Sequence, residues 1–568
     1  MVPKKVIGIS TMFVLVFLLM VSMVGCTDDS SSGDDDDDGG IAADDDDDDY
    51  SGDDSNWGDD DDSFSSDDDD YYGDDDSHGG PDDDDSCDDD YDDDVTDDDD
   101  ASVDDDDETD DDDEVEDPYE CPETTDNTLL FLSADDSNSQ ASPIVVRDII
   151  ESGGIVPAHA VRTYEFTNYY QIEYDYPQYG ELKILPQMRS KGVGDFGTEL
   201  VLQIGAQSYQ VNAANQRPKN IVLSLDTSGS MSGTPIALLK EVCKAIAKQL
   251  RAGDILSMVE WSSSQTVVLD SHVVTGPNDP AVLSAIVGLH SGGSTDLHGG
   301  LVRAYELAEN NYGADKLNRV VLISDGGANT GVTDINIIAQ AADDSEGQGI
   351  YMVGVGVGEA GYYYNDDLMD AVTDAGKGAY VFVDSANEAW KQFDDRFQEN
   401  MEVAALDVRV SLEMPYYLLM KEFHGEEYSE NPDEVEPQHL GPNDAMVFHQ
   451  ILVVCDEDLL DTSDLITVRA FYIDPFSLAE KNDERTMSIA DMLAAEAPQL
   501  TKGDAVVAYA ESLKQIYDLR YTDPDQALQI CVETRQMVEQ AADELGDTEL
   551  EDITALLQQY EVTLGGKL

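Results

Sequence analysis

Residues 221–230 read IVLSLDTSGS, an apolar run that ends in an aspartate and a loop of small hydroxyl side chains. A short apolar run bounded by such a loop is typical of a buried strand. A helix is predicted next, over 235–250, because its apolar residues recur every three or four positions. The stretch therefore predicts a strand, a polar loop and a helix in succession.

The same alternation continues to residue 401. Strands are predicted at 255–261, 266–269, 319–323, 350–355 and 379–383, and helices at 281–289, 297–309, 335–342, 366–375 and 386–401. Repeated strand–helix units predict an α/β fold with a doubly wound, mostly parallel sheet covered on both faces. In such sheets ligands bind beyond the carboxyl ends of the strands.

Three polar loops follow predicted strands or lie between predicted elements at that edge. They read Asp226-Thr227-Ser228-Gly229-Ser230, Gly292-Gly293-Ser294-Thr295-Asp296 and Ser324-Asp325-Gly326-Gly327. From these loops, two carboxylates and three hydroxyls are expected to converge, and they are hard oxygen donors that suit a divalent cation, above all Mg²⁺, with Ca²⁺ or Mn²⁺ as alternatives. Because only two donors are anionic, the cation would keep positive charge and could take a carboxylate from outside.

The order D-x-S-x-S, then Thr after Gly-Gly, then Asp after a strand resembles the metal-ion-dependent adhesion site of von Willebrand factor A domains. The resemblance implies a Rossmann-like fold and a metal site. The residues that match the family's ligand positions are Asp226, Ser228, Ser230, Thr295 and Asp325. It also implies that the hydroxyls bind directly and that the two aspartates often act through water.

Segments on both sides of this region resemble YfbK-like bacterial lipoproteins. They include 160–170 with 174–177, 318–326, 331–334 and 502–509, and the likeness spans about residues 140 to 568. Gly327-Ala328 departs from the family, which more often has Asp-Phe there, and the acidic tail is longer than expected. Neither departure touches a predicted ligand, so they leave the partner rather than the fold in doubt.

The N-terminus has the composition of an export signal. Lys4 and Lys5 precede an apolar run over 6–23, and the segment ends in Met23-Val24-Gly25-Cys26, which resembles a lipobox. We expect residues 1–26 to be a lipoprotein signal and Cys26 to be lipidated, with an uncleaved membrane helix as the alternative. Thr27, rather than Asp, favours the outer membrane or cell surface of the bacterial envelope.

Charge is concentrated in the segment that follows. The net charge is -97, and residues 27–120 hold 53 Asp and Glu without a Lys or Arg. Such a chain cannot bury enough apolar surface to fold, so 27–118 is predicted to be a disordered linker. It lacks the regular spacing of calcium loops. The remaining 73 acidic residues outnumber 27 basic ones, which argues against nucleic acid as a partner.

Four further segments complete the predicted organisation. They are an N-terminal module at 119–216, the von Willebrand factor A domain at 217–402, a β-rich module at 403–480 and a helical C-terminal module at 481–568, with Asp523-Pro524 starting one helix. Apart from Cys26, five cysteines without CxxC spacing argue against a zinc cluster. Cys243 is expected in the core, and a Cys87–Cys121 bridge is left open.

Other readings of the loops are weaker. Ser, Thr and Asp also cap helices, but three such loops in this order are an unusual set of caps. A G-x-S-x-G nucleophile elbow is not present at 229–233, because Met231 occupies the nucleophile position. An aspartyl-phosphate enzyme would need Asp where Ser228 stands, and His290 and His298 are more simply solvated or capping residues than bases.

The sequence therefore predicts an envelope-anchored binding protein, not an enzyme. Its cation would coordinate an acidic group, Glu or Asp, of a protein partner, and its lipid anchor would hold it at the membrane. The alternatives are a metal-dependent hydrolase, an accessory subunit of an envelope enzyme complex, or a purely structural spacer.

Overall fold

The computed structural model describes residues 119–567, apart from 136–137, 213–214, 327–348, 359–365 and 377. The predicted signal with Cys26, the acidic linker 27–118 and the predicted helix 335–342 lie outside the described residues. Within the described part, no helix has both the length and the apolar character needed to cross a bilayer.

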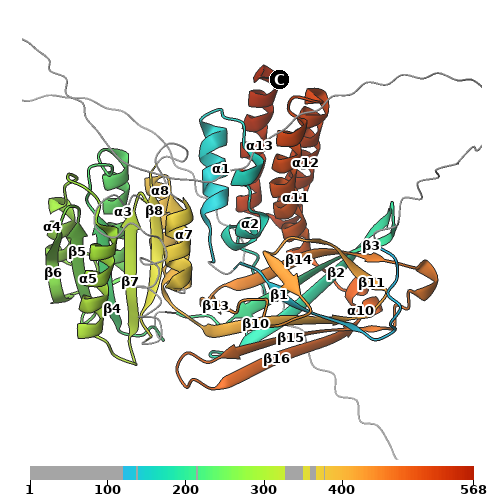
Figure 1. Cartoon of the computed structure of the whole chain (residues 1–568), viewed down its shortest axis with the longest axis horizontal. Coiled ribbons are helices and arrows are strands. Elements are labelled where there is room, and N and C mark those ends of the chain that lie inside the picture. The colour runs from blue at the N-terminus through green and yellow to red at the C-terminus, as the bar shows by residue number, and fades with distance from the viewer. Residues whose placement is uncertain are drawn as a thin grey trace, which may run out of the picture. The chain divides into compact units, whose positions relative to one another are not determined.

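A six-stranded sheet occupies the middle of the chain, in the order β6-β5-β4-β7-β8-β9 (Figure 1). Its strands are β4 (Lys219–Asp226), β5 (Ile255–Trp261), β6 (Gln265–Val273), β7 (Leu317–Ser324), β8 (Tyr351–Val357) and β9 (Tyr380–Val383). All neighbours are parallel except β5 and β6. By sequence this is the order 3-2-1-4-5-6 of doubly wound nucleotide-binding folds, which reverses direction between β4 and β7.

Helices cover both faces of this sheet because successive strand residues point to opposite sides. Ile221, Leu223 and Leu225 pack in one core with α3 (Thr234–Gln249) and α4 (Pro280–Gly288). Val222 packs in the other core with α5 (Leu297–Asn310). Apart from β6 at the edge, the strands are largely buried on both faces, which explains their nearly continuous apolar sequences.

The end of the central domain is helical, but its last helix is interrupted. After α7 (Asp366–Ala375), the predicted helix 386–401 is formed as α8 (Ala386–Trp390), a π-helical segment (Lys391–Asp395) and α9 (Phe397–Met401). Phe393, Phe397 and Met401 still lie in the core beside β4 and β8, so the burial expected of this helix is retained.

The two segments that flank the central domain share one β-sandwich. The first sheet has the order β11-β14-β3-β2, and the second has β12-β1-β10-β15-β16, with β13 beside β10. Their bounds are β1 (Thr128–Ser133), β2 (Leu182–Gly194), β3 (Gly197–Ser208), β10 (Ala405–Met414), β11 (Leu418–Phe423), β12 (Glu427–Ser429), β13 (Gln438–Leu440), β14 (Ala445–Val454), β15 (Leu465–Ile473) and β16 (Glu480–Ser488).

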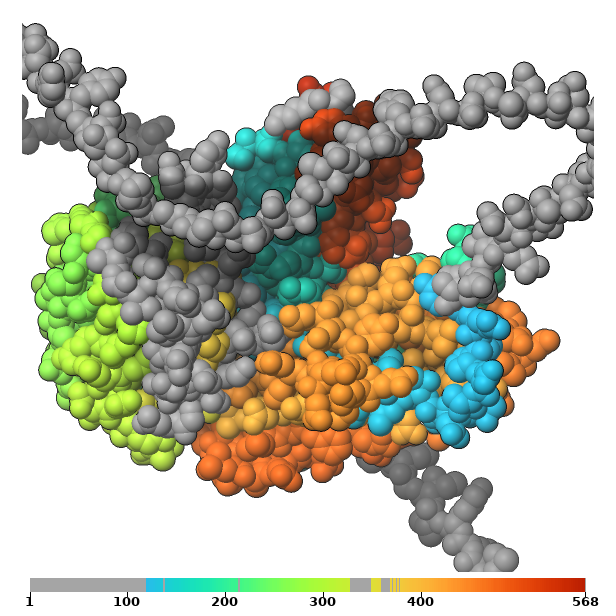
Figure 2. Space-filling view, in the orientation of Figure 1, coloured from blue at the N-terminus to red at the C-terminus, as the bar shows by residue number. Residues whose placement is uncertain are grey.

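This pairing differs from the predicted division into a module at 119–216 and another at 403–480. Strand β3 pairs with β14 over nine residues, and β1 pairs with β10 and β12. Figure 2 shows the start of the described chain, which contains β1, in blue against the orange strands. Buried residues of both segments fill the same hydrophobic core, so the two are parts of one sandwich rather than separate modules.

Five of the remaining helices form a layer with the α5 side of the central sheet. They are α1 (Ala141–Glu151), α2 (Thr163–Tyr169), α11 (Pro498–Leu519), α12 (Pro524–Leu545) and α13 (Thr548–Lys567), whereas α10 (Ile489–Ala494) packs in the core of the sandwich. Buried residues of α1, α2 and α11–α13 belong to the same core as α5. As predicted, α12 begins at Pro524, and Asp523 accepts a hydrogen bond from the backbone N–H of Gln526.

A disulfide joins Cys121 to Cys455, which are 334 residues apart in sequence. The Cys87–Cys121 bridge that was left open above is therefore wrong, because Cys121 pairs with Cys455. Cys87 lies outside the described residues. The partner could not be recognised from sequence because it follows β14, whose place beside β3 is set by the sandwich. Cys243 is a buried free thiol in the core, as expected.

Candidate metal centre

The strand order brings two of the three polar loops to one point. Asp226 is the last residue of β4, and Asp325 directly follows β7. These strands are parallel neighbours, with Leu225 opposite Ile323. Both aspartates therefore lie at the carboxyl edge of the sheet, where the strand order reverses and ligands bind in this type of fold.

The carboxylate of Asp226 is fully buried, and both of its oxygens accept hydrogen bonds. The backbone N–H of Ser228 donates to Oδ1 at 2.8 Å, and the hydroxyl of Ser324 donates to Oδ2 at 2.7 Å. Burial raises the pKa of Asp226 to about 7; these hydrogen bonds oppose the rise and the negative charge of Asp325 adds to it. A cation at this point would relieve both the burial of the charge and the repulsion between the two carboxylates.

The first loop presents two hydroxyls beside this carboxylate. The Oγ atoms of Ser228 and Ser230 lie 3.0 Å apart. Ser228 is buried, whereas Gly229 and Ser230 are exposed. The group of oxygen atoms therefore begins in the interior at Asp226 and reaches solvent at Ser230.

Backbone hydrogen bonds fix the second loop against the first. Gly292 N donates to Thr227 O at 2.7 Å, and Gly229 N donates to Gly293 O at 3.0 Å. Gly293 has a φ of +93°, and a Cβ there would lie 2.9 Å from the Oγ of Ser263. Glycine is therefore required for this close approach. Thr295, two residues further on, is buried.

The structure thus brings the five predicted residues to one edge of the sheet. Asp226, Ser228 and Ser230 share a loop, Thr295 lies in the loop bonded to it, and Asp325 lies close enough to influence the pKa of Asp226. Among the described residues, no group of three or more His, Cys, Asp or Glu side chains is arranged to hold a metal. A cation here would depend on hydroxyl donors, and this oxygen set fits Mg²⁺, Ca²⁺ or Mn²⁺. The ligand role of each residue stays a prediction.

Two residues near the site had no role predicted from the sequence. Ser324 orients Asp226, and the only sequence signal was a polar residue at the end of a buried apolar strand. Asp296 caps α5, accepting from Gly299 N at 3.1 Å. His290 is exposed.

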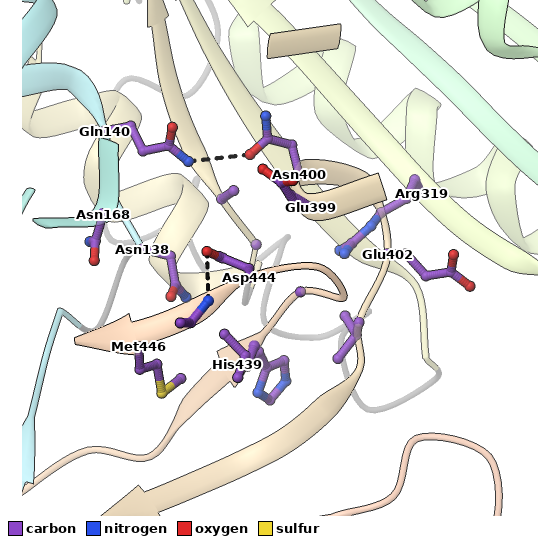
Figure 3. Close-up of a pocket in the computed structure, with 16 residues that line it drawn as sticks. Asn138, Gln140, Asn168, Arg319, Glu399, Asn400, Glu402, His439, Asp444 and Met446 are labelled. Atoms are coloured by element: carbon purple, nitrogen blue, oxygen red, sulfur yellow. Dashed lines mark hydrogen bonds between the residues drawn. The ribbon is translucent and has the colours of Figure 1, made fainter. Parts of the chain in front are cut away.

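A separate polar cavity of about 40 Å³ lies near the start of β7 rather than beyond its end (Figure 3). Its lining includes Gln140, Arg319, Glu399, Asn400 and Asp444. Gln140 donates to Asn400 Oδ1 at 3.2 Å, and Arg319 Nε donates to Met401 O at 2.6 Å. A space of this size holds a few water molecules. The cavity lies where the start of β7 meets α9, β13 and β14, and it is not part of the metal centre.

Comparison with known proteins agrees with this fold. Residues 220–396 match the family model of the von Willebrand factor type A domain, and the chain therefore contains a domain of that family. Such domains bind a divalent cation at a metal-ion-dependent adhesion site, commonly use it in metal-dependent protein interaction, and occur mostly in non-enzymatic binding proteins. The predicted domain family and fold class are confirmed.

Among individual proteins, the chain is similar to the uncharacterized protein YfbK of Escherichia coli (strain K12), with 27% identity over 299 residues, which are 51% of each chain. It is also 24% identical over 235 residues to the uncharacterized protein sll0103 of Synechocystis sp., covering 41% of this chain and 54% of that one. The chain thus spans about half the length of these relatives. A solved von Willebrand factor type A protein from Catenulispora acidiphila aligns with a TM-score of 0.40 and 16% identity, covering 68% of this chain and 91% of that one.

Proposed function

We propose that the chain is a cell-envelope-anchored protein that binds an acidic group of a protein partner through a divalent cation. The observation that carries the proposal is the setting of Asp226, a buried carboxylate oriented by Ser324 and Ser228, next to hydroxyls that reach solvent at Ser230. A bound cation would explain why a buried carboxylate lies beside hydroxyls that open to solvent.

The cation, Mg²⁺ first and Ca²⁺ or Mn²⁺ as alternatives, would be held by the five residues predicted from sequence. They are Asp226, Ser228, Ser230, Thr295 and Asp325. When bound it supplies a positive charge that a carboxylate can approach. The protein contributes orientation, because the backbone bonds between the first two loops fix the hydroxyls before a partner arrives.

Anchoring in the bacterial envelope is part of the same proposal. It rests on the lipobox-like residues that end in Cys26. The Cys121–Cys455 disulfide supports it, because disulfides persist in oxidising compartments outside the cytoplasm. Labelling cells with a fatty-acid analogue tests this part: label should enter the wild-type chain and be lost in Cys26→Ser.

Binding is tested by capture of envelope proteins on the full chain, with Mg²⁺ and then with a chelator. A partner should be retained only with Mg²⁺, and Asp226→Ala should lose it. Asp315→Ala is the matched control, since Asp315 is an exposed aspartate outside the three loops. A partner that binds equally well with the chelator or to Asp226→Ala would contradict the proposal.

A further inference from the structure

The β2–β3 hairpin extends beyond the sheet to which it belongs. The last residue of β3 that pairs with β14 is Glu199, opposite Val453. Two more pairs, Gly194 with Gly197 and Val193 with Thr198, continue the hairpin beyond the last strand pairing with β14. The connection itself is only Asp195 and Phe196. The hairpin therefore ends in a narrow tip that projects past its sheet (Figure 1).

The tip combines an acidic side chain with exposed apolar ones. Val193 is 82% exposed and Phe196 is 37% exposed. Asp195 lies between them in sequence, is exposed, and makes no hydrogen bond or ion pair with any described residue. Two exposed aspartates, Asp456 and Asp461, are engaged locally: Asp456 accepts from Asp458 N, and Asp461 accepts from Ser463 N. Asp195 is thus a carboxylate available to a partner, with apolar surface on both sides.

The surrounding contacts fix the base of this tip, and the ring of Phe196 packs edge-on against Tyr119, with ring centroids 5.2 Å apart. Thr198 N donates to Glu457 Oε1 at 2.7 Å, and the carboxylate of Glu199 pairs with Lys421. Gly197 has a φ of +135°, and a Cβ there would lie 2.5 Å from Val454 O. A fixed tip loses little conformational freedom when it binds, which favours affinity.

The metal centre offers a complementary surface. Its rim has no bulky side chain at Gly229, Ser230, Gly292 or Gly293, all of which are exposed. A carboxylate on a narrow hairpin could enter such a rim, and the flanking apolar residues could pack on its small residues. The required ligand is the acidic group that the proposed function assigns to this site.

We propose that Asp195 of one molecule supplies this carboxylate to the metal centre of a second copy. This inference rests on the proposed function and names one partner for it. Because the hairpin and the metal centre are different surfaces, the contact is heterologous, and repeated contacts would produce an open chain of molecules or a closed ring.

Sedimentation velocity on the full chain tests the idea. Wild type should associate when Mg²⁺ is added and dissociate with a chelator, while Asp195→Asn alone and Asp226→Asn alone should stay monomeric. An equimolar mixture of the two variants should form a one-to-one dimer, since one contributes only an intact centre and the other only an intact tip. Val193→Ser should weaken association about tenfold through lost apolar contact.

Controls separate this inference from the proposed function. Asp270→Asn removes an exposed aspartate elsewhere and should associate like wild type. Ser230→Ala provides a second centre variant if Asp226→Asn folds poorly. Monomeric wild type that binds Mg²⁺ in calorimetry would overturn the head-to-tail contact and leave the metal site standing. Undiminished association of Asp195→Asn would overturn it too and point to the acidic linker as the ligand. No Mg²⁺ binding at all would overturn both proposals.

Discussion

The hydroxyl of Ser324 donates a hydrogen bond of 2.7 Å to Oδ2 of Asp226 and so joins the ends of β7 and β4. The backbone of Ser228 bonds the other oxygen, so the carboxylate cannot rotate without breaking a bond in a buried setting. The orientation of the central acidic residue is therefore set by the neighbouring strand and by its own loop.

Replacing Ser324 with Ala should weaken Mg²⁺ binding. The variant removes the donor to Asp226 but none of the predicted ligands, and loss of such a supporting bond typically lowers metal affinity about 10–100-fold. Calorimetric titration measures the change. Ser257→Ala is the matched control, because Ser257 is buried in the middle of β5, and its Mg²⁺ affinity should equal that of wild type. Equal affinity in Ser324→Ala would contradict the role assigned to this bond.

Substitution of Gly293 should damage the site through the backbone. Ala at φ +93° is strained, and its Cβ would press on Ser263, so we expect a loss of about 1–3 kcal/mol in the free energy of unfolding and weaker Mg²⁺ binding. Denaturant unfolding and calorimetry measure the two effects. Gly288→Ala is the comparison, since a Cβ there meets nothing within 4 Å. Similar results for the two variants would show that the second loop tolerates displacement.

The polar cavity near the start of β7 predicts a pH dependence of stability. Burial, and then the charge of Asp444, raise the pKa of Glu399 from 4.5 to about 8. Between those values the folded protein keeps a proton that the unfolded chain has lost, so the free energy of unfolding should fall as pH rises from about 5 to 8. The contribution is at most about 1.4 kcal/mol per pH unit.

Glu399→Gln should remove this contribution and make the pH profile measured by denaturant unfolding at several pH values less steep. Glu480→Gln, at an exposed position, should leave the wild-type slope unchanged. A slope in Glu399→Gln as steep as in wild type would mean that Glu399 is ionised in the folded protein throughout this range.

The Cys121–Cys455 disulfide should contribute to stability, because it ties the N-terminal end of the described chain to the sandwich. Cys455→Ser should lower the free energy of unfolding by about 2–5 kcal/mol. A reductant should lower the wild-type value by a similar amount and leave the variant unchanged. If the reductant destabilises both equally, its effect arises elsewhere.

The central domain was predictable because its information is local. Each strand from β4 to β9 is a short apolar run, and each predicted loop directly follows a strand or precedes a helix, so the carboxyl edge could be inferred without knowing distances. Asp226 and Asp325 could be placed together for that reason. The hydrogen bond of Ser324 could not, because it depends on which strands are neighbours and on one rotamer.

The flanking regions were harder to predict because their contacts are remote in sequence. The pairing of β3 with β14 joins residues about 240 positions apart, as between Gln207 and Ala445, and alternating strands carry no signal of their partner. The Cys121–Cys455 bond follows from the same arrangement. The two segments were therefore predicted to be separate modules, whereas they form one sandwich.

The most direct measurement is anomalous diffraction from crystals of the protein soaked in Mn²⁺. The account predicts one strong Mn²⁺ peak within coordination or water-bridged distance of Asp226, Ser228, Ser230, Thr295 and Asp325, and its loss in Asp226→Ala. Well-ordered loops with no peak among these oxygen atoms would contradict the claim that they form a metal centre.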